Sequence, residues 1–122
     1  MYDSQTSIKY IESRFPELTE QLQDELWDGI LHLQISVFAR LAQKAIDDGD
    51  SSKWQKISHT FLDLWRNCTP EVQNAFNVSF LENLNFNDGK KQRSWAYNSM
   101  PLEMSKAWDA MEAYNQKLHE NQ

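Results

Sequence analysis

Residues 69–84 read Thr-Pro-Glu-Val-Gln-Asn-Ala-Phe-Asn-Val-Ser-Phe-Leu-Glu-Asn-Leu, and this stretch decides the fold. Thr69 is a good helix N-cap, because its hydroxyl oxygen can accept a hydrogen bond from a first-turn amide, and Pro70 supplies the backbone angle of the first helical position. Apolar residues then recur at three- and four-residue spacing as far as Leu84, over most of the helix surface. We therefore expect a central helix near residues 70–84 that packs on more than one side.

Helical spacing of apolar residues continues on both sides of this stretch, in segments that Pro, Gly and Asn residues separate. The residues expected to face inward are Ile8, Ile11 and Phe15; Leu18, Leu22 and Leu26; Ile30, Leu33, Val37, Leu41 and Ala45, widened by Phe38 and Ala42; Trp54, Ile57, Phe61, Leu64 and Trp65; and Met104, Ala107 or Trp108, Met111, Tyr114 or Asn115, and Leu118. No stretch alternates with period two over the length of a strand. The 122 residues therefore predict one all-α domain, residues 1–122, with about six or seven antiparallel helices.

Turn residues mark the boundaries between these segments. Phe15-Pro16 disfavours helical geometry at Phe15 and ends the first helix, while Pro16 opens the second. The sequence Asp47-Asp48-Gly49-Asp50 ends the third helix, and Ser51 or Ser52 is expected to cap the next. The third and fourth segments should then form a helical hairpin.

The net charge of −6 is unevenly distributed along the chain. Residues 1–50 contain ten acidic and four basic residues, whereas residues 51–122 contain eight of each. Within the first half, Glu17, Glu20, Asp24 and Asp28 follow one another at three- and four-residue spacing, where like charges repel. A one-sided negative field favours a basic partner and disfavours nucleic acid, although acidity that serves only solubility remains an alternative.

Catalytic and metal-binding patterns are mostly absent from the sequence. His32 and His59 each have an acid at helical spacing, Asp28 and Asp63, but a zinc site needs three or four ligands and no His pair or Cys–His pair has metal-binding spacing. The acidic turn at residues 47–50 resembles the start of a calcium loop, but counting from Asp48 the sixth position is Lys53 instead of glycine, and the twelfth is His59 instead of glutamate. Glycine-rich phosphate loops are also missing. We therefore predict no metal, no cofactor and no catalytic residues, and expect that the protein is not an enzyme.

The sequence also bears on compartment. Cys68 is the only cysteine and cannot form an internal disulfide, which is typical of a reducing compartment. Residues 1–20 lack the pattern of a signal peptide, and no apolar run is long enough to cross a membrane. We expect a cytoplasmic protein that binds no membrane.

One short basic run, containing Lys90, Lys91 and Arg93, precedes Trp95 and Tyr97. Basic side chains beside aromatic rings are typical of nucleic-acid binding. Three such charges in an acidic molecule favour solvation or pairing with the acidic half, so no direct contact with nucleic acid is predicted.

The segment Val72–Leu84 resembles small all-helical bacterial proteins, some of which act as immunity proteins beside secreted toxins. The resemblance is strongest at Val78–Glu82 and includes Arg14–Leu18, within a layout that spans most of residues 10–110. The chain is also similar to the helical immunity proteins of contact-dependent growth inhibition systems. This resemblance implies a cytoplasmic inhibitor that binds a toxin domain and covers its active site. It assigns no functional residue to a position of this chain.

The charge pattern gives that implication a physical form. Nuclease toxins need basic substrate clefts, and an acidic surface can imitate phosphate and speed encounter. The predicted partner-binding residues are the acidic Glu20, Asp24, Asp28, Asp47, Asp48 and Asp50, with Trp27 as an aromatic anchor, although a core position for Trp27 remains open. A monomer is expected.

An adaptor or homodimeric structural module without catalytic activity is the alternative. Met and aromatic side chains suit adaptable docking grooves, so exposed Trp95, Tyr97, Met100 and Met104 would favour it.

Overall fold

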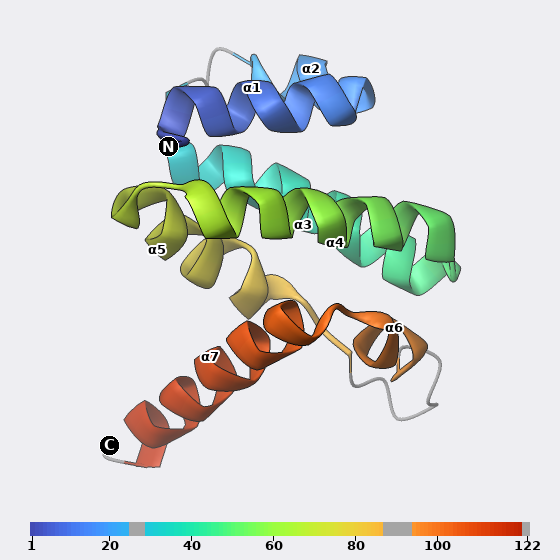
Figure 1. Ribbon diagram of the computed structural model, residues 1–122, viewed down its shortest axis with the longest axis vertical. Helices are drawn as coiled ribbons and strands as arrows, with labels where there is room; N and C mark the ends of the chain where they lie inside the picture. The colour runs from blue at the N-terminus through green and yellow to red at the C-terminus, as the bar shows by residue number, and fades with distance from the viewer. Residues whose placement is uncertain (25–28, 87–93, 121–122) are drawn as a thin grey trace.

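The computed structural model describes residues 1–24, 29–86 and 94–120. The described helices are α1 (Ser4–Arg14), η1 (Pro16–Leu18), α2 (Thr19–Leu22), α3 (Leu31–Asp48), α4 (Ser51–Asn67), α5 (Pro70–Ser79), η2 (Leu81–Asn83), α6 (Ser94–Ser99) and α7 (Leu102–Glu120), where η denotes a 3₁₀ helix. Their buried apolar side chains form one cluster. The predicted all-α bundle is confirmed (Figure 1).

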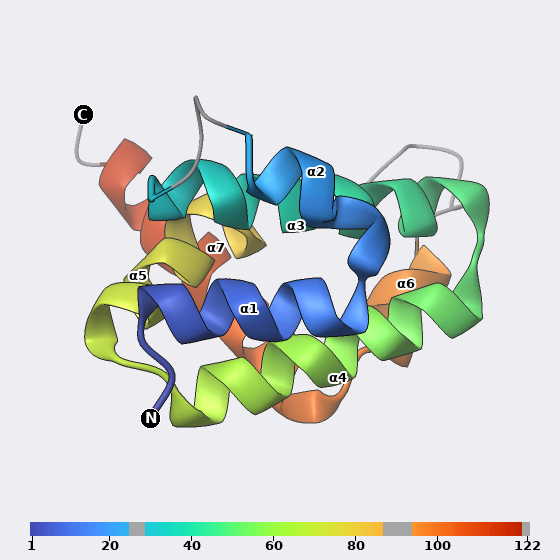
Figure 2. The same ribbon diagram turned by 90° about the horizontal axis from the view of Figure 1, so that it is seen from above.

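The N-terminal segment is fixed by hydrogen bonds at the point where α1 begins. Asp3 caps α1 by accepting a hydrogen bond from the backbone N–H of Thr6, whose hydroxyl in turn accepts from the backbone N–H of Asp3. Tyr2 bridges the α4–α5 junction, donating to the carbonyl of Asn67 at 2.7 Å and accepting from the N–H of Thr69 at 2.9 Å. This anchoring places α1 across α3 and α4 (Figure 2).

The α3–α4 hairpin has the predicted position and a different cap. Gly49 ends α3 with a left-handed φ of 69°, a conformation that costs glycine little. Asp50, rather than the expected Ser51 or Ser52, caps α4 by accepting from the N–H of Lys53 at 3.1 Å. Asp50 can do this because the turn leaves α3 at Gly49 and enters α4 one residue later.

The central helix is shorter than predicted but holds the predicted position. The α-helical ladder of α5 breaks off after Ser79, with Phe80 as its C-cap, and η2 continues the chain as a 3₁₀ helix. This break turns the Phe80 ring into the core, where it stacks on Phe38 of α3 at 5.0 Å and on Phe61 of α4 at 5.3 Å and meets Phe76 edge-on. We call these four rings the Phe80 cluster. Through the fully buried Phe80 ring, this cluster joins α3, α4 and α5.

The inward faces of α1 and α4 are confirmed. That of α3 is confirmed in its later turns, where Val37, Phe38, Ala42 and Ala45 are buried, and is wrong at its start. Ile30 precedes α3 and is exposed, and Leu33 also faces solvent. The buried positions begin at Leu31 and include Ile35 and Phe38. The sequence pattern misled because α3 is apolar on several sides, and only its packing against α1, α2, α4 and α5 selects the inner face.

The second and last helices also differ from expectation. The segment after Pro16 forms only η1 and α2, with Leu18 and Leu22 buried as predicted, and Leu26 lies outside the described residues. In α7, the first turns pack through Met104 and Met111. The outer turns project away from the bundle (Figure 1), so Tyr114 and Leu118 are exposed because no core remains for them to reach.

Candidate functional site

The acidic segment around α2 is tied to the start of α4. Glu17 of η1 forms an ion pair with Lys53 of α4, and this hydrogen bond holds the pKa of the Glu17 carboxyl below its usual value. Lys53 also lies over the Phe15 ring, 5.5 Å from its centroid. Glu20 and Asp24, the next acids along the chain, are exposed.

The α3–α4 turn supplies the second group of predicted acids, and each has a structural partner. Asp47 accepts a hydrogen bond from Nε2 of Gln43 at 3.0 Å. Asp48 pairs with Lys44 at 2.9 Å, which raises the pKa of the lysine, and Asp50 caps α4. All three side chains remain exposed.

The Glu17–Lys53 pair joins η1 to the beginning of α4, beside the Asp50 cap, and so links the chain before α2 to the helix that follows the acidic turn. Trp27 and Asp28, the remaining predicted site residues, lie outside the described ranges. Ion pairs within the chain cannot remove the charge excess, because 18 acidic residues face only 12 lysines and arginines. We call Glu20, Asp24, Asp47, Asp48 and Asp50 the acidic surface.

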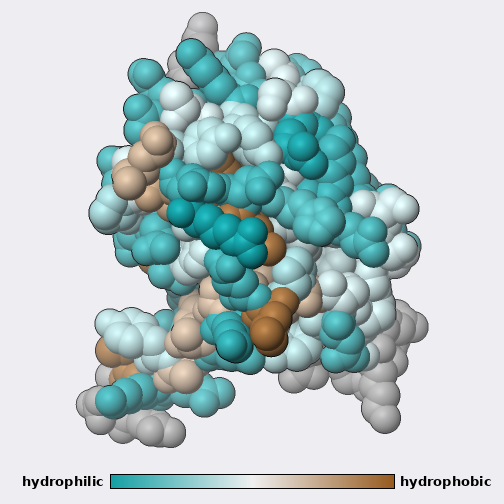
Figure 3. Space-filling model, in the orientation of Figure 1, coloured by the Kyte–Doolittle hydropathy of each residue, from teal (hydrophilic) through white to brown (hydrophobic). Residues whose placement is uncertain are grey.

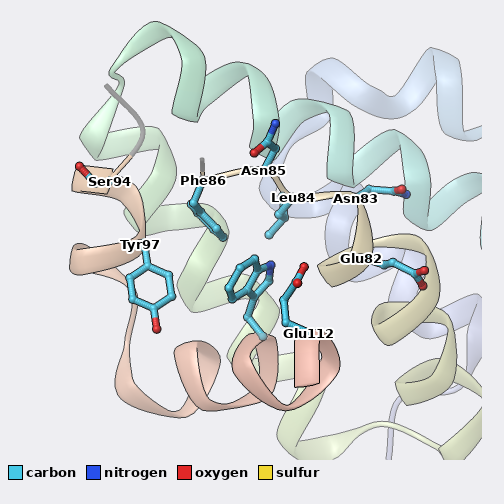
Figure 4. A pocket seen from close by; sticks show the side chains of 9 residues that line it. Glu82, Asn83, Leu84, Asn85, Phe86, Ser94, Tyr97 and Glu112 are labelled. Atoms are coloured by element: carbon cyan, nitrogen blue, oxygen red, sulfur yellow. The ribbon is translucent and has the colours of Figure 1, made fainter. Parts of the chain in front are cut away.

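A pocket of about 600 Å³ lies between η2, α6 and α7, and it was not predicted from the sequence (Figure 4). Rings of Phe86, Tyr97 and Trp108 line it, and each contacts the other two edge-on with centroids 5.3–5.8 Å apart. Phe86 also meets the fully buried Trp54 at 5.9 Å. We call these four rings the Phe86 cluster and the space beside them the aromatic pocket.

Polar groups complete the wall of the aromatic pocket. Glu82 of η2 and Glu112 of α7 contribute carboxylates, and Asn83, Asn85 and Ser94 contribute neutral polar groups. In Figure 4, Ser94 lies on the same side as Phe86 and Tyr97, Glu112 rises from α7 in the middle, and Asn83 and Glu82 lie on the opposite side.

Hydrogen bonds fix two of the rings. The Tyr97 hydroxyl donates to the Asp109 carboxylate, with oxygen distances of 2.8 and 3.0 Å, and this bond raises the pKa of Tyr97. Nε1 of Trp54 donates to the Ala96 carbonyl at 2.9 Å and so anchors α6 on α4. Nε1 of Trp108 is buried and has no acceptor among the described residues.

The aromatic pocket is joined to the acidic surface by one side chain. Gln43 of α3 donates both to Asp47 and to the carbonyl of Asn85, at 3.0 and 3.1 Å, and accepts from the N–H of Asn85 at 2.9 Å. The two views of the ribbon place α6 beside the α3–α4 turn (Figures 1 and 2). An acidic stretch of surface thus reaches the rim of the pocket.

A second cleft, of about 430 Å³, separates α5 from the outer turns of α7. Val78 and Tyr114 line it and are 48 % and 64 % exposed, and Leu118 lies one turn beyond Tyr114. Figure 3 shows brown and tan groups gathered over α7 and a notch beside its outer end, below a largely hydrophilic body. The apolar surface suggested earlier is absent, because Met100 and Met104 are buried and Trp95 and Tyr97 are half-buried.

The histidines and the cysteine do not form a reactive group with one another among the described residues. Nδ1 of His32 lies 2.8 Å from the Ser79 hydroxyl, and His59 is exposed. Burial raises the pKa of the Cys68 thiol, which disfavours the reactive thiolate. Among residues 1–24, 29–86 and 94–120, no three His, Cys, Asp or Glu side chains form a group that could hold a metal. No helix in these ranges has the length and apolar character of a membrane span.

Comparison with known proteins yields one match. Residues 8–116 match a family model described as a domain of unknown function, DUF7674. No curated protein and no solved structure matches the chain.

Proposed function

The chain belongs to the DUF7674 family, and we propose that this member is a non-catalytic inhibitor of the immunity type, which acts in the cytoplasm and binds a basic toxin domain. Its acidic surface would cover the substrate cleft of that domain. The observation that supports this proposal best is the exposure of the acidic side chains around α2 and at the α3–α4 turn.

The physical basis is electrostatic. A nuclease cleft that binds phosphates is positive, so a surface with a fixed excess of carboxylates accelerates encounter and competes with the substrate. The α3–α4 turn suits this role because Gly49 and the Asp50 cap fix the backbone that carries its acids. A fixed backbone lowers the entropy that is lost on binding.

The test needs the cognate toxin domain. The candidate is the C-terminal basic domain of a large secreted protein encoded beside this chain, and binding is measured by stopped-flow fluorescence at low and physiological salt. Glu20→Lys should slow association about threefold at low salt, and the double variant Glu20→Lys/Asp24→Lys should slow it about tenfold. Both effects should be smaller at higher salt, because ions screen the attraction.

The matched control is Glu71→Lys, which changes the net charge by the same amount as Glu20→Lys but lies in the first turn of α5. Its association rate should stay near that of the unaltered protein. The proposal fails if Glu20→Lys and Glu71→Lys have equal effects, or if the basic domain does not bind.

An adaptor or homodimer is the second candidate, and the apolar cleft between α5 and α7 favours it. A second copy that covered Val78, Tyr114 and Leu118 would bury apolar surface rather than charge, so the dimer would persist at high salt. Sedimentation equilibrium separates the two candidates, because the inhibitor is expected to be a monomer at all salt concentrations.

A further inference from the structure

The aromatic pocket has two kinds of wall, and both favour a cation. The faces of aromatic rings attract positive charge, and Phe86, Tyr97 and Trp108 meet at one side of the pocket. The Glu112 carboxylate lies beside the rings, and Glu82 lies at the edge of the same space (Figure 4). A neutral apolar ligand would desolvate those carboxylates without compensation.

Arginine fits these walls better than other cationic side chains. Its planar guanidinium stacks on aromatic rings and donates in pairs to a carboxylate, whereas a lysine ammonium is a compact, strongly hydrated charge.

We propose that the aromatic pocket receives an arginine side chain of the protein partner. This inference rests on the proposed function, because the partner is the basic domain that the acidic surface attracts. The Gln43 bridge between Asp47 and Asn85 makes the two surfaces continuous, so one partner can cover the α3–α4 turn and insert a side chain beside Asn85. The acidic surface would then govern encounter, and the pocket would govern how long the complex lasts.

The first test uses the full chain and a small probe, N-acetyl-arginine methylamide. The indole N–H signals of the five tryptophans are followed by ¹H–¹⁵N NMR during titration, and the Trp108 signal is assigned with Trp108→Phe. We expect the Trp108 signal to shift and saturate. The Trp65 signal serves as an internal reference, because Trp65 stacks on Phe61 and does not line the pocket.

The corresponding citrulline compound is the matched probe, since it has nearly the same shape without the charge. It should bind about fivefold more weakly, the change expected for a cation–π contact of about 1 kcal/mol. Equal binding of the two probes, or no shift of the Trp108 signal with either, would overturn the inference.

The second test removes one charge from the wall. Glu112→Gln keeps the size of the side chain and should weaken binding of the arginine probe about three- to fivefold. Glu71→Gln, an exposed position that does not line the pocket, makes the same change in net charge and should leave the affinity unchanged. A similar loss in both variants would show that only net charge matters, and would contradict the assignment.

The toxin complex separates this inference from the function on which it rests. Glu112→Gln should raise the dissociation rate of the complex, whereas Glu20→Lys should lower the association rate. If Glu20→Lys acts as expected and Glu112→Gln changes nothing, only the pocket assignment fails. If the arginine probe binds but the basic domain does not, the proposed inhibitor function fails and the cation pocket stands.

Discussion

The molecule contains two aromatic clusters that are built from similar residues and differ in their surroundings. In the Phe80 cluster the central ring is fully buried and touches apolar partners from three helices. In the Phe86 cluster, Tyr97 and Trp108 are only half-buried, and carboxylates and amides border the same space. Aromatic content alone therefore does not identify the core. A cluster surrounded by apolar side chains stabilises the fold, whereas a cluster bordered by polar groups and open space is a candidate binding site.

Truncating the two central rings gives the largest expected contrast. Phe80→Ala should lower the free energy of unfolding by about 3–5 kcal/mol, because it leaves a closed cavity, while Phe86→Ala should cost about 2 kcal/mol because one side of that ring borders open space. Urea denaturation measures both. Val78→Ala, at an exposed position of α5, is the control and should change stability little. If Phe86→Ala lowered the free energy of unfolding more than Phe80→Ala, the Phe86 cluster rather than the Phe80 cluster would contribute most to the stability of the core.

The anchor of α6 on α4, beside the Phe86 cluster, gives a second, smaller effect. Trp54 is fully buried and holds α6 through its bond to the Ala96 carbonyl. Trp54→Phe should lower the free energy of unfolding by about 2 kcal/mol, because the carbonyl keeps only the Ser99 hydroxyl as a donor and the ring becomes smaller. Hydrogen exchange should report faster opening of α6 (Ser94–Ser99), with α3 amides unchanged. Equal acceleration in both helices would mean that α6 does not open separately from the core.

The fold was largely predictable because helix caps and apolar spacing are local properties. The Thr69-Pro70 start, the Gly49 end and the buried residues of α4 all follow from short windows of sequence. The inner face of α3 and the break at Phe80 depend on tertiary packing. A strong apolar spacing from Val72 to Leu84 fits a continuous helix equally well, and only the contacts with Phe38 and Phe61 favour the break.

The candidate site was predictable only in part. The charge asymmetry predicted an acidic binding surface, because charge counts need no tertiary information, and its binding role stays a prediction. The aromatic pocket draws Glu82, Phe86, Tyr97 and Glu112 from three separate elements, so no spacing rule joins them. A weak signal was Phe86 itself, a large apolar residue inside a polar turn sequence, whose ring had to be buried against something.

The smallest effect concerns two tyrosine–aspartate bonds, one in the body of the bundle and one beside the pocket. The Tyr10 hydroxyl donates to the Asp63 carboxylate at 2.6 Å. Burial, together with this bond, raises the pKa of Tyr10 to about 12. The pKa of Tyr97 is also raised, mainly by its bond to Asp109. A tyrosine whose folded pKa is raised stabilises the fold fully below its unfolded pKa of about 10, and that contribution is lost as the pH rises through the folded pKa.

Tyr10→Phe should therefore lower stability at pH 8 by about 0.5–1 kcal/mol, because the lost bond is partly exposed, and Tyr97→Phe should lower it less. Between pH 10 and about 12 the difference between Tyr10→Phe and the unaltered protein should shrink, since ionisation of Tyr10 removes the same bond. Alkaline absorbance titration with urea denaturation at each pH measures both. If the stability difference between Tyr10→Phe and the unaltered protein stayed constant up to pH 12, the pKa of Tyr10 would not be raised by its bond to Asp63. The two tyrosine–aspartate bonds would then not differ in their effect on stability at high pH.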